Sequence, residues 1–203
     1  MISLIDMFPS IVDVLDAVAE DGSTSELRGQ AEHLSHFIQS FGFVFNLHLM
    51  RYILGVSNEL SQALQRKDQD IVNAMKLVRI SKERLQIMRE NGWSSLLDEV
   101  STFCGINKIL VPDMDDIYVA RGRSRRYTDG MTNLHFYRVE LFYAIIDMQL
   151  QELNNRFTES NTELLLCVSC LSPSDFFATF DKQKLIHLIL SKRFFFIEAH
   201  DTF

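Results

Sequence analysis

Apolar side chains recur along this chain at spacings of three and four residues, and strict alternation of apolar and polar residues is almost absent. Spacings of three and four place side chains on one face of an α-helix, whereas a half-buried strand needs a period of two. Breaks are few, since the 203 residues include only 3 prolines and 8 glycines. We therefore predict an all-α fold of long antiparallel helices with no β-sheet.

The first half of the chain is expected to hold two helices, over residues 2–19 and 26–64, separated by the polar stretch "EDGSTS". The second of these carries a long apolar stripe that should face inward. The stripe comprises Leu34, Phe37, Phe41, Val44, Phe45, Ile53, Val56, Leu60 and Leu64.

A third helix is predicted to begin near Ile71 and to end at "ENGW", residues 90–93, because Asn and Gly tolerate the left-handed conformation of a C-terminal cap. A short helix with Trp93 in the core should follow. Residues 106–131 lack periodicity and are expected to form a long loop.

Thr132 can cap a helix that reaches about Phe157. This helix carries two apolar stripes, so its first half should be buried nearly all round. Weaker helices are expected near residues 160–171 and 175–190. The apolar runs are too short for a membrane span of roughly 20 residues, so no membrane contact is expected.

Charge is distributed unevenly. The net charge of the chain is -7, and residues 65–110 carry 8 basic and 6 acidic side chains while residues 1–64 carry 2 and 8. Only the middle of the chain could therefore present positive charge to phosphate. The candidate nucleic-acid contacts are Lys76, Arg79, Lys82, Arg84 and Arg89 on the third helix, and Arg121, Arg123, Arg125 and Arg126 in the loop. For the loop arginines, the spacing leaves two interpretations equally open: phosphate binding or a nuclear import signal, and a solvated linker.

Other clusters are better explained by structure than by chemistry. Cys167 and Cys170 have the spacing of a zinc half-site but lack two further ligands, so they are predicted to be buried apolar residues. His33 and His36 similarly lack a third ligand. Asp113, Asp115 and Asp116 follow a proline and are read as a solvated turn. We predict no metal, no cofactor and no enzymatic activity. Three cysteines and the lack of a secretory leader favour a soluble, intracellular protein.

Residues 134–185, beginning "LHFYRVELFYAIIDMQLQELNNRF", resemble plant zinc-finger MYM-type-like (TTF-type) members of the hAT transposase superfamily. The resemblance extends to "LQRKDQDIVNAMKLVRISKERLQIMRENGWSSLLDEVSTFC" (64–104) and "GRSRR" (122–126). It implies that residues 1–188 form a helical insertion domain. The family's DNA-binding zinc finger and catalytic carboxylates have no counterpart here. Residues 189–203 depart from the family pattern and are expected to be a non-native tail.

Two functions follow from this resemblance. The first is a non-catalytic fragment of a transposon-derived protein, a helical scaffold with residual, weak and non-specific DNA contact at the nine basic residues. The alternative is a domesticated regulatory protein that acts through protein interfaces. In both cases the resemblance implies a nuclear location, self-association and partners among other hAT-like proteins.

Overall fold

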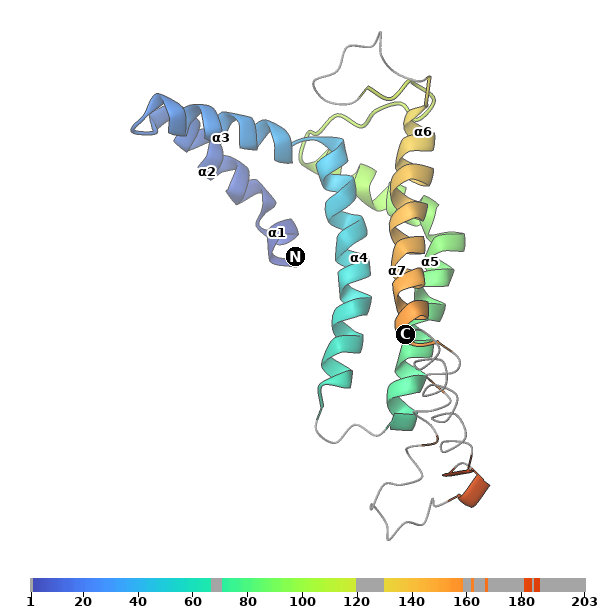
Figure 1. Cartoon of the computed structure of the whole chain (residues 1–203). Coiled ribbons are helices and arrows are strands. Elements are labelled where there is room, and N and C mark those ends of the chain that lie inside the picture. The colour runs from blue at the N-terminus through green and yellow to red at the C-terminus, as the bar shows by residue number, and fades with distance from the viewer. Residues whose placement is uncertain are drawn as a thin grey trace, which may run out of the picture. The chain divides into compact units, whose positions relative to one another are not determined.

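The structure is a computed structural model, and every regular element among the residues that it describes is a helix (Figure 1). A single β-bridge, between Ile117 and Thr132, is the only strand-like pairing among the described residues. The all-α prediction is confirmed. The described residues are 2–66, 71–119, 130–158, 162, 167, 181–183 and 185–186. The predicted tail 189–203 and most of the two weak helices lie outside them.

The chain divides into two compact units. Unit 1 comprises Met1–Val56 and Leu85–Asp147, and unit 2 comprises Ser57–Arg84 and Met148–Phe203. The helices are α1 (Ile2–Asp6), α2 (Phe8–Asp21), α3 (Ser25–Ile38), α4 (Phe41–Leu64), α5 (Ile71–Ile106), α6 (Asn133–His135), the π-helix η2 (Phe136–Tyr143) and α7 (Ala144–Arg156).

The helix predicted over residues 2–19 is interrupted at Met7, which separates α1 from α2. Pro9 is the cause, because proline has no backbone N–H and its ring clashes with the preceding turn, so it is tolerated only in the first turn of a helix. It occupies the first turn of α2. Phe8 is fully buried there, with its ring edge-on to Phe103 at 5.1 Å between centroids.

The helix predicted over residues 26–64 is two helices, α3 and α4, separated by Gln39 and Ser40. The Ser40 hydroxyl joins them, donating to the Phe37 carbonyl at 2.6 Å and accepting from the Phe43 N–H at 3.3 Å. This break turns α3 away from the line of α4 and lays it beside α2 (Figure 1). Leu34 and Phe37, predicted to be core residues, are consequently 46% and 44% exposed.

The predicted end of a helix at residues 90–93 is wrong, because α5 continues through it from Ile71 to Ile106. Gly92 lies inside the helix, where the Met88 side chain occupies the space that a Cβ would take. The true end of α5 is a Schellman cap. Lys108 takes a positive φ of 56°, and the N–H of Ile109 donates to the Cys104 carbonyl at 2.8 Å.

An aromatic core joins α4, α5 and η2 within unit 1. The Phe45 ring lies 5.9 Å from Trp93 and 5.1 Å from Tyr137, and Trp93 lies 5.7 Å from Phe142. All four side chains are buried. The prediction that Trp93 is a core residue is confirmed. Since these rings share one cluster, α4 and α5 are held by the segment that follows the long loop.

Thr132 caps α6 as predicted, and its hydroxyl accepts from the His135 N–H at 3.2 Å. The helical segment then continues to Arg156, but residues 136–143 form a π-helix. Bonds from residue i to i+5 align residues five apart, which differ by about 140° in an α-helix. Tyr137 and Phe142 are therefore buried together while Val139 is 39% exposed. The prediction of burial nearly all round is wrong.

Candidate nucleic-acid interface

Five basic side chains of α5 were predicted to contact nucleic acid, and the structure assigns them different roles. Lys76 and Arg79 are exposed on unit 2. Arg79 lies 3.6 Å from Glu83, with both side chains largely exposed. An exposed pair of this kind contributes little to stability and is screened by salt. These two cations are therefore accessible to phosphate.

Arg84 and Lys82, also in unit 2, are engaged by neighbouring helices. Arg84 pairs with Glu59 of α4. Lys82 donates to the carbonyl of Phe157 at 3.0 Å, just beyond the end of α7. A cation is favourable at this position because the last carbonyls of a helix carry partial negative charge. Both side chains thus connect helices of unit 2.

Arg89 of unit 1 is held by a bidentate ion pair with Asp147 of α7. Its Nε lies 2.5 Å from Oδ1 and its Nη2 lies 3.0 Å from Oδ2. The guanidinium also lies over the Tyr143 ring, 5.0 Å from its centroid. Hydrogen bonding from Asp147, and then its charge, raise the pKa of Arg89 above its ordinary value. This arginine joins α5 to the segment that carries η2 and α7.

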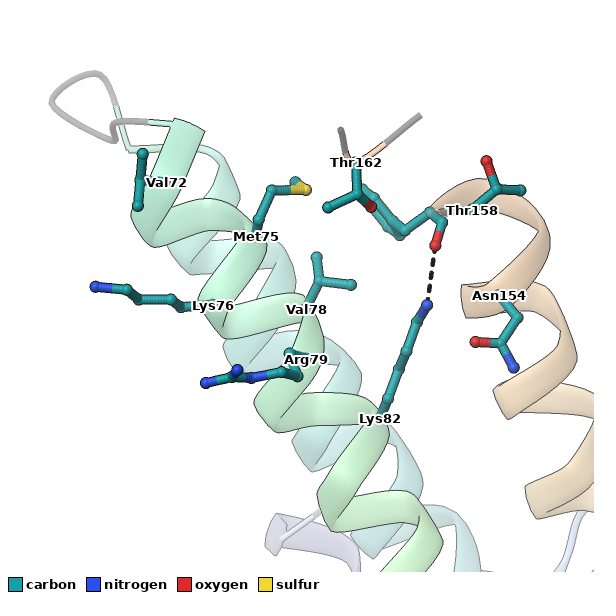
Figure 2. A pocket seen from close by; sticks show the side chains of 10 residues that line it. Val72, Met75, Lys76, Val78, Arg79, Lys82, Asn154, Thr158 and Thr162 are labelled. Atoms are coloured by element: carbon teal, nitrogen blue, oxygen red, sulfur yellow. Dashed lines mark hydrogen bonds between the residues drawn. The ribbon is translucent and has the colours of Figure 1, made fainter. Parts of the chain in front are cut away.

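A cavity of about 830 Å³ in unit 2 coincides with the basic residues (Figure 2). Lys76, Arg79 and Lys82 belong to its lining, together with Met75 and residues that follow α7. Figure 2 shows Lys82 reaching toward the end of α7, whereas Lys76 and Arg79 point to the other side of α5. Most of the cavity lining is apolar, and the charged ends of Lys76 and Arg79 are directed away from the end of α7.

Arg121, Arg123, Arg125 and Arg126 lie outside the described residues. Two of the nine predicted contacts, Lys76 and Arg79, thus remain as exposed cations in the part of the chain that the structure describes.

The three clustered aspartates form a turn, as predicted. The Asp113 carboxylate accepts from the Asp115 N–H at 3.0 Å, and all three residues are exposed. Their main chain is anchored by Asn133, whose amide donates to the Asp113 carbonyl at 2.7 Å. The N–H of Asn133 donates to the Asp116 carbonyl at 2.8 Å.

The described cysteines are buried, whereas the histidine pair of α3 is exposed. Cys104 and Cys167 are buried, and burial raises the pKa of the Cys104 thiol to about 11. Cys170 lies outside the described residues, and both His33 and His36 are exposed on α3. Within the described ranges no three His, Cys, Asp or Glu side chains are grouped so that they could hold a metal ion.

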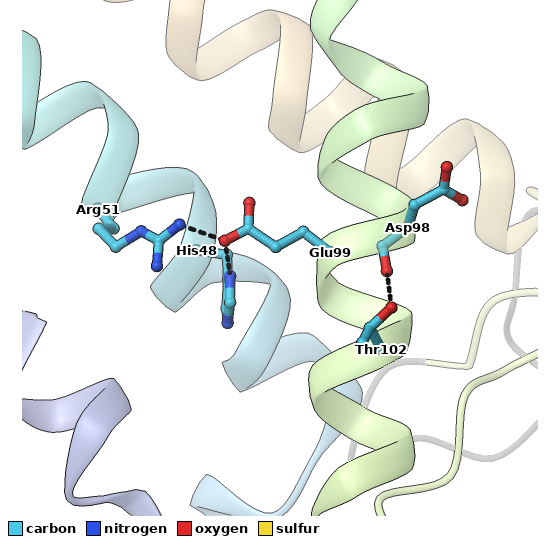
Figure 3. Close-up of polar contacts among 5 residues, drawn as sticks. All are labelled: His48, Arg51, Asp98, Glu99 and Thr102. Carbon is cyan, nitrogen blue, oxygen red and sulfur yellow. Dashed lines mark hydrogen bonds and ion pairs between the residues drawn. The ribbon is translucent and has the colours of Figure 1, made fainter.

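One polar cluster was missed by sequence reasoning. Figure 3 shows Glu99 of α5 between His48 and Arg51 of α4. The Nδ1 of His48 lies 3.1 Å from the Glu99 carboxylate, which also pairs with Arg51. A carboxylate only accepts, so Nδ1 carries the proton. Nε2 is then a buried acceptor that has no hydrogen-bond partner among the described residues. The sequence did contain one indication that His48 is buried: it follows Phe45, a predicted core residue, by three positions on the same helix.

A groove in unit 1 was also missed. We call it the acidic groove, and its volume is about 950 Å³. Its apolar lining comes from the start of α4, from the loop after α5 and from Tyr137, while Asp113 and Asp116 bring negative charge. The full lining is Phe37, Ser40, Phe41, Gly42, Phe43, Asn46, Leu110, Val111, Pro112, Asp113, Asp116, Ile117, Tyr118, Val119, Asn133 and Tyr137.

Among the described residues, no helix combines the length and apolar character that crossing a bilayer requires. Comparison with known proteins adds no assignment: no protein-family model matches the chain, and no solved structure matches it.

Proposed function

We propose that this chain is a non-catalytic helical interaction module derived from the insertion domain of a hAT-superfamily transposase. The resemblance of residues 64–104, 122–126 and 134–185 supports the origin, and the all-α architecture is compatible with it. The proposal assigns no catalytic, metal or cofactor residue. Protein contact is its main activity, and DNA contact is secondary.

The observation that carries this proposal is an exposed apolar stripe on α3. Leu27, Leu34 and Phe37 are 43%, 46% and 44% exposed. Spacings of seven and three residues place them on one face of the helix. Apolar side chains gathered on a surface in this way mark contact sites for other proteins. A second copy of the chain, or another hAT-like protein, is the partner implied by the resemblance.

Sedimentation equilibrium over a range of protein concentrations tests the self-association. We expect the wild-type chain to reach twice the mass of one chain, and the double variant Leu27→Lys/Leu34→Lys to remain at the mass of one. Two lysines introduced into a buried interface would leave charges unpaired, at a cost of several kcal/mol.

The matched control is Leu54→Lys/Ile87→Lys, which adds the same charge at two positions that are 45% and 59% exposed on other helices. It should associate like the wild type. A wild-type chain that stays at single mass at every concentration would contradict self-association through α3.

The second candidate is a domesticated nuclear regulatory protein that acts on other protein partners. The acidic groove favours it, because an apolar groove with a charged rim suits a heterologous partner better than a second copy of a chain whose net charge is -7. Nuclear location is tested by imaging a fluorescent fusion. Loss of nuclear signal when Arg121, Arg123, Arg125 and Arg126 become Ala would assign the arginine stretch to import.

A further inference from the structure

We propose that the acidic groove docks a basic amphipathic helix of another protein, with apolar side chains in the groove and Lys or Arg at its rim. This inference deepens the interaction function proposed above and rests on it.

The floor and walls of the groove are apolar and aromatic. Phe41 and Tyr137 form the floor, each less than a tenth exposed, with ring centroids 4.9 Å apart in an edge-on arrangement. The walls expose apolar area to solvent: Leu110 is 87% exposed and Ile117 is 54% exposed. With about 950 Å³, the groove lies at the upper end of the roughly 300–1,000 Å³ typical of ligand pockets. It can accept several side chains at once.

The negative charge of the groove favours a partner that carries positive charge. Asp113 and Asp116 line it, and its described lining includes no Lys, Arg or His. Two amides of the lining are already engaged within the fold, since the Asn46 amide donates to the Gly42 carbonyl at 2.8 Å and the Asn133 amide donates to the Asp113 carbonyl at 2.7 Å. The two exposed carboxylates are the charged groups of the lining that can meet an external cation. Complementary charge at such a rim steers encounter and excludes acidic partners.

The groove is largely preformed. The loop that carries the aspartates is tied to the start of α6, where the Leu134 N–H donates to the Met114 carbonyl at 2.8 Å and Asn133 makes the two bonds described above. The Tyr118 ring stacks on Phe136 with 3.6 Å between centroids. A surface fixed in this way loses little conformational freedom on binding.

Of a β-strand partner and a helical partner, this surface suits the helix. Recognition of an extended strand relies on main-chain pairing with an open sheet edge, and the described residues form no sheet. An apolar groove instead receives the apolar face of an amphipathic helix through residues spaced three and four apart.

Fluorescence anisotropy with a labelled synthetic peptide tests the proposal. The probe is a helix of roughly 18 residues, about five turns, with leucine at spacings of three and four and lysine elsewhere. Two matched peptides accompany it: a scrambled sequence of the same composition, and a peptide with glutamate in place of lysine. We expect the Leu/Lys helix to bind the full chain at least about tenfold more tightly than either control.

Variants locate the binding site. Ile117→Lys should weaken binding of the Leu/Lys helix by about tenfold or more, because it places a cation in the apolar wall against a basic partner. Ile87 is 59% exposed and lies outside the groove lining. The control Ile87→Lys should therefore leave binding unchanged. Asp113→Asn/Asp116→Asn should reduce the affinity and its dependence on salt, because fewer charge pairs remain to be screened.

The proposal is overturned if the wild-type chain does not bind the Leu/Lys helix, if the scrambled or glutamate peptide binds equally well, or if Ile117→Lys and Ile87→Lys have the same effect. Its failure is distinct from failure of self-association. Leu27→Lys/Leu34→Lys should abolish the dimer but still bind the peptide, and Ile117→Lys should do the reverse.

Discussion

His48 is a residue whose protonation opposes folding. Burial, the largest influence, lowers its pKa below the ordinary value of 6.5, while the charge of Glu99 acts in the opposite direction and Arg51 adds to the lowering. These are the charged groups that face the ring from α4 and α5. A second proton would reside on Nε2, which is buried without an acceptor among the described residues.

The expected result is a fold that weakens on acidification. With the folded pKa below 6.5, the unfolded chain binds the proton first as pH falls. The free energy of unfolding should therefore decrease as pH drops through 6.5 toward the lower folded value, and it should recover above that window. Urea unfolding monitored by circular dichroism between about pH 8 and pH 5 measures it.

His48→Phe should flatten this pH dependence, because the titrating group is gone. His33→Gln, at an exposed position on α3, is the control and should keep the wild-type profile. Equal profiles for all three proteins would show that His48 does not titrate between the folded and unfolded states.

At the level of elements, the π-helix η2 determines which face of the helical segment from Asn133 to Arg156 is buried. It contains one more residue between Tyr137 and Phe142 than an α-helix would use to bring the same two side chains together. Deletion of Val139, which is 39% exposed, should convert the segment to an α-helix and leave both aromatic residues in the core. We expect the free energy of unfolding to stay within about 1 kcal/mol of wild type.

The control is deletion of Glu90, an exposed residue inside α5. Because α5 is already α-helical, this deletion turns everything after it by about 100° relative to the residues before it. It should cost several kcal/mol, because Trp93, Leu96 and Val100 would lose their buried positions. Thermal unfolding compares the two proteins, and equal losses of stability would contradict the role given to the π-helix.

Helix content was predictable from sequence because apolar spacing is a local property, and so was the Thr132 cap. Helix ends were less predictable where tertiary packing overrides local signals. "ENGW" has the composition of a helix stop, yet α5 continues through it, with Trp93 buried in the core. The break before α4, at Gln39 and Ser40, contains no glycine or proline, and the Ser40 hydroxyl bonds to the main chain on both sides of it.

The candidate sites were even harder to predict from the sequence. The basic stripe on α5 was visible in the sequence, but its carboxylate partners Glu59 and Asp147 come from other helices. His48 and Glu99 are separated by 51 positions, and no local pattern links them. The acidic groove combines three separate segments, so its shape depends on packing and could not be read from any single one.

For the whole molecule, the negative net charge opposes DNA binding, while locally concentrated basic residues favour it. A chain of net charge -7 is repelled by DNA unless basic residues are concentrated where phosphate can reach them. The two exposed cations of α5, Lys76 and Arg79, and the four arginines of residues 121–126 are the candidates. We predict weak, non-specific DNA binding that disappears at moderate salt.

Fluorescence anisotropy with duplex DNA at several salt concentrations measures this. Each phosphate contact contributes about 0.9 to the slope of log affinity against log salt. Lys76→Ala/Arg79→Ala should therefore reduce the slope by up to about 2. Replacing Arg121, Arg123, Arg125 and Arg126 with Ala should reduce it by up to about 4. Arg89→Ala should leave the slope unchanged, because Asp147 already neutralises that side chain.

Absence of binding at low salt would remove DNA contact from the proposed function and leave only protein contact. A changed slope for Arg89→Ala, in a protein whose circular dichroism matches wild type, would instead show that its ion pair opens for phosphate.

The pairing of Tyr118 with Met131 has a practical consequence for protein engineering. The Tyr118 N–H donates to the Met131 carbonyl at 2.8 Å, and Ile117 and Thr132 form the β-bridge beside it. The two ends of the arginine segment are therefore fastened to each other by the scaffold itself. We expect that residues 120–129 can be replaced by a neutral linker, or cut to create new termini. The hydrogen bond between Tyr118 and Met131 would still hold the segments on either side together.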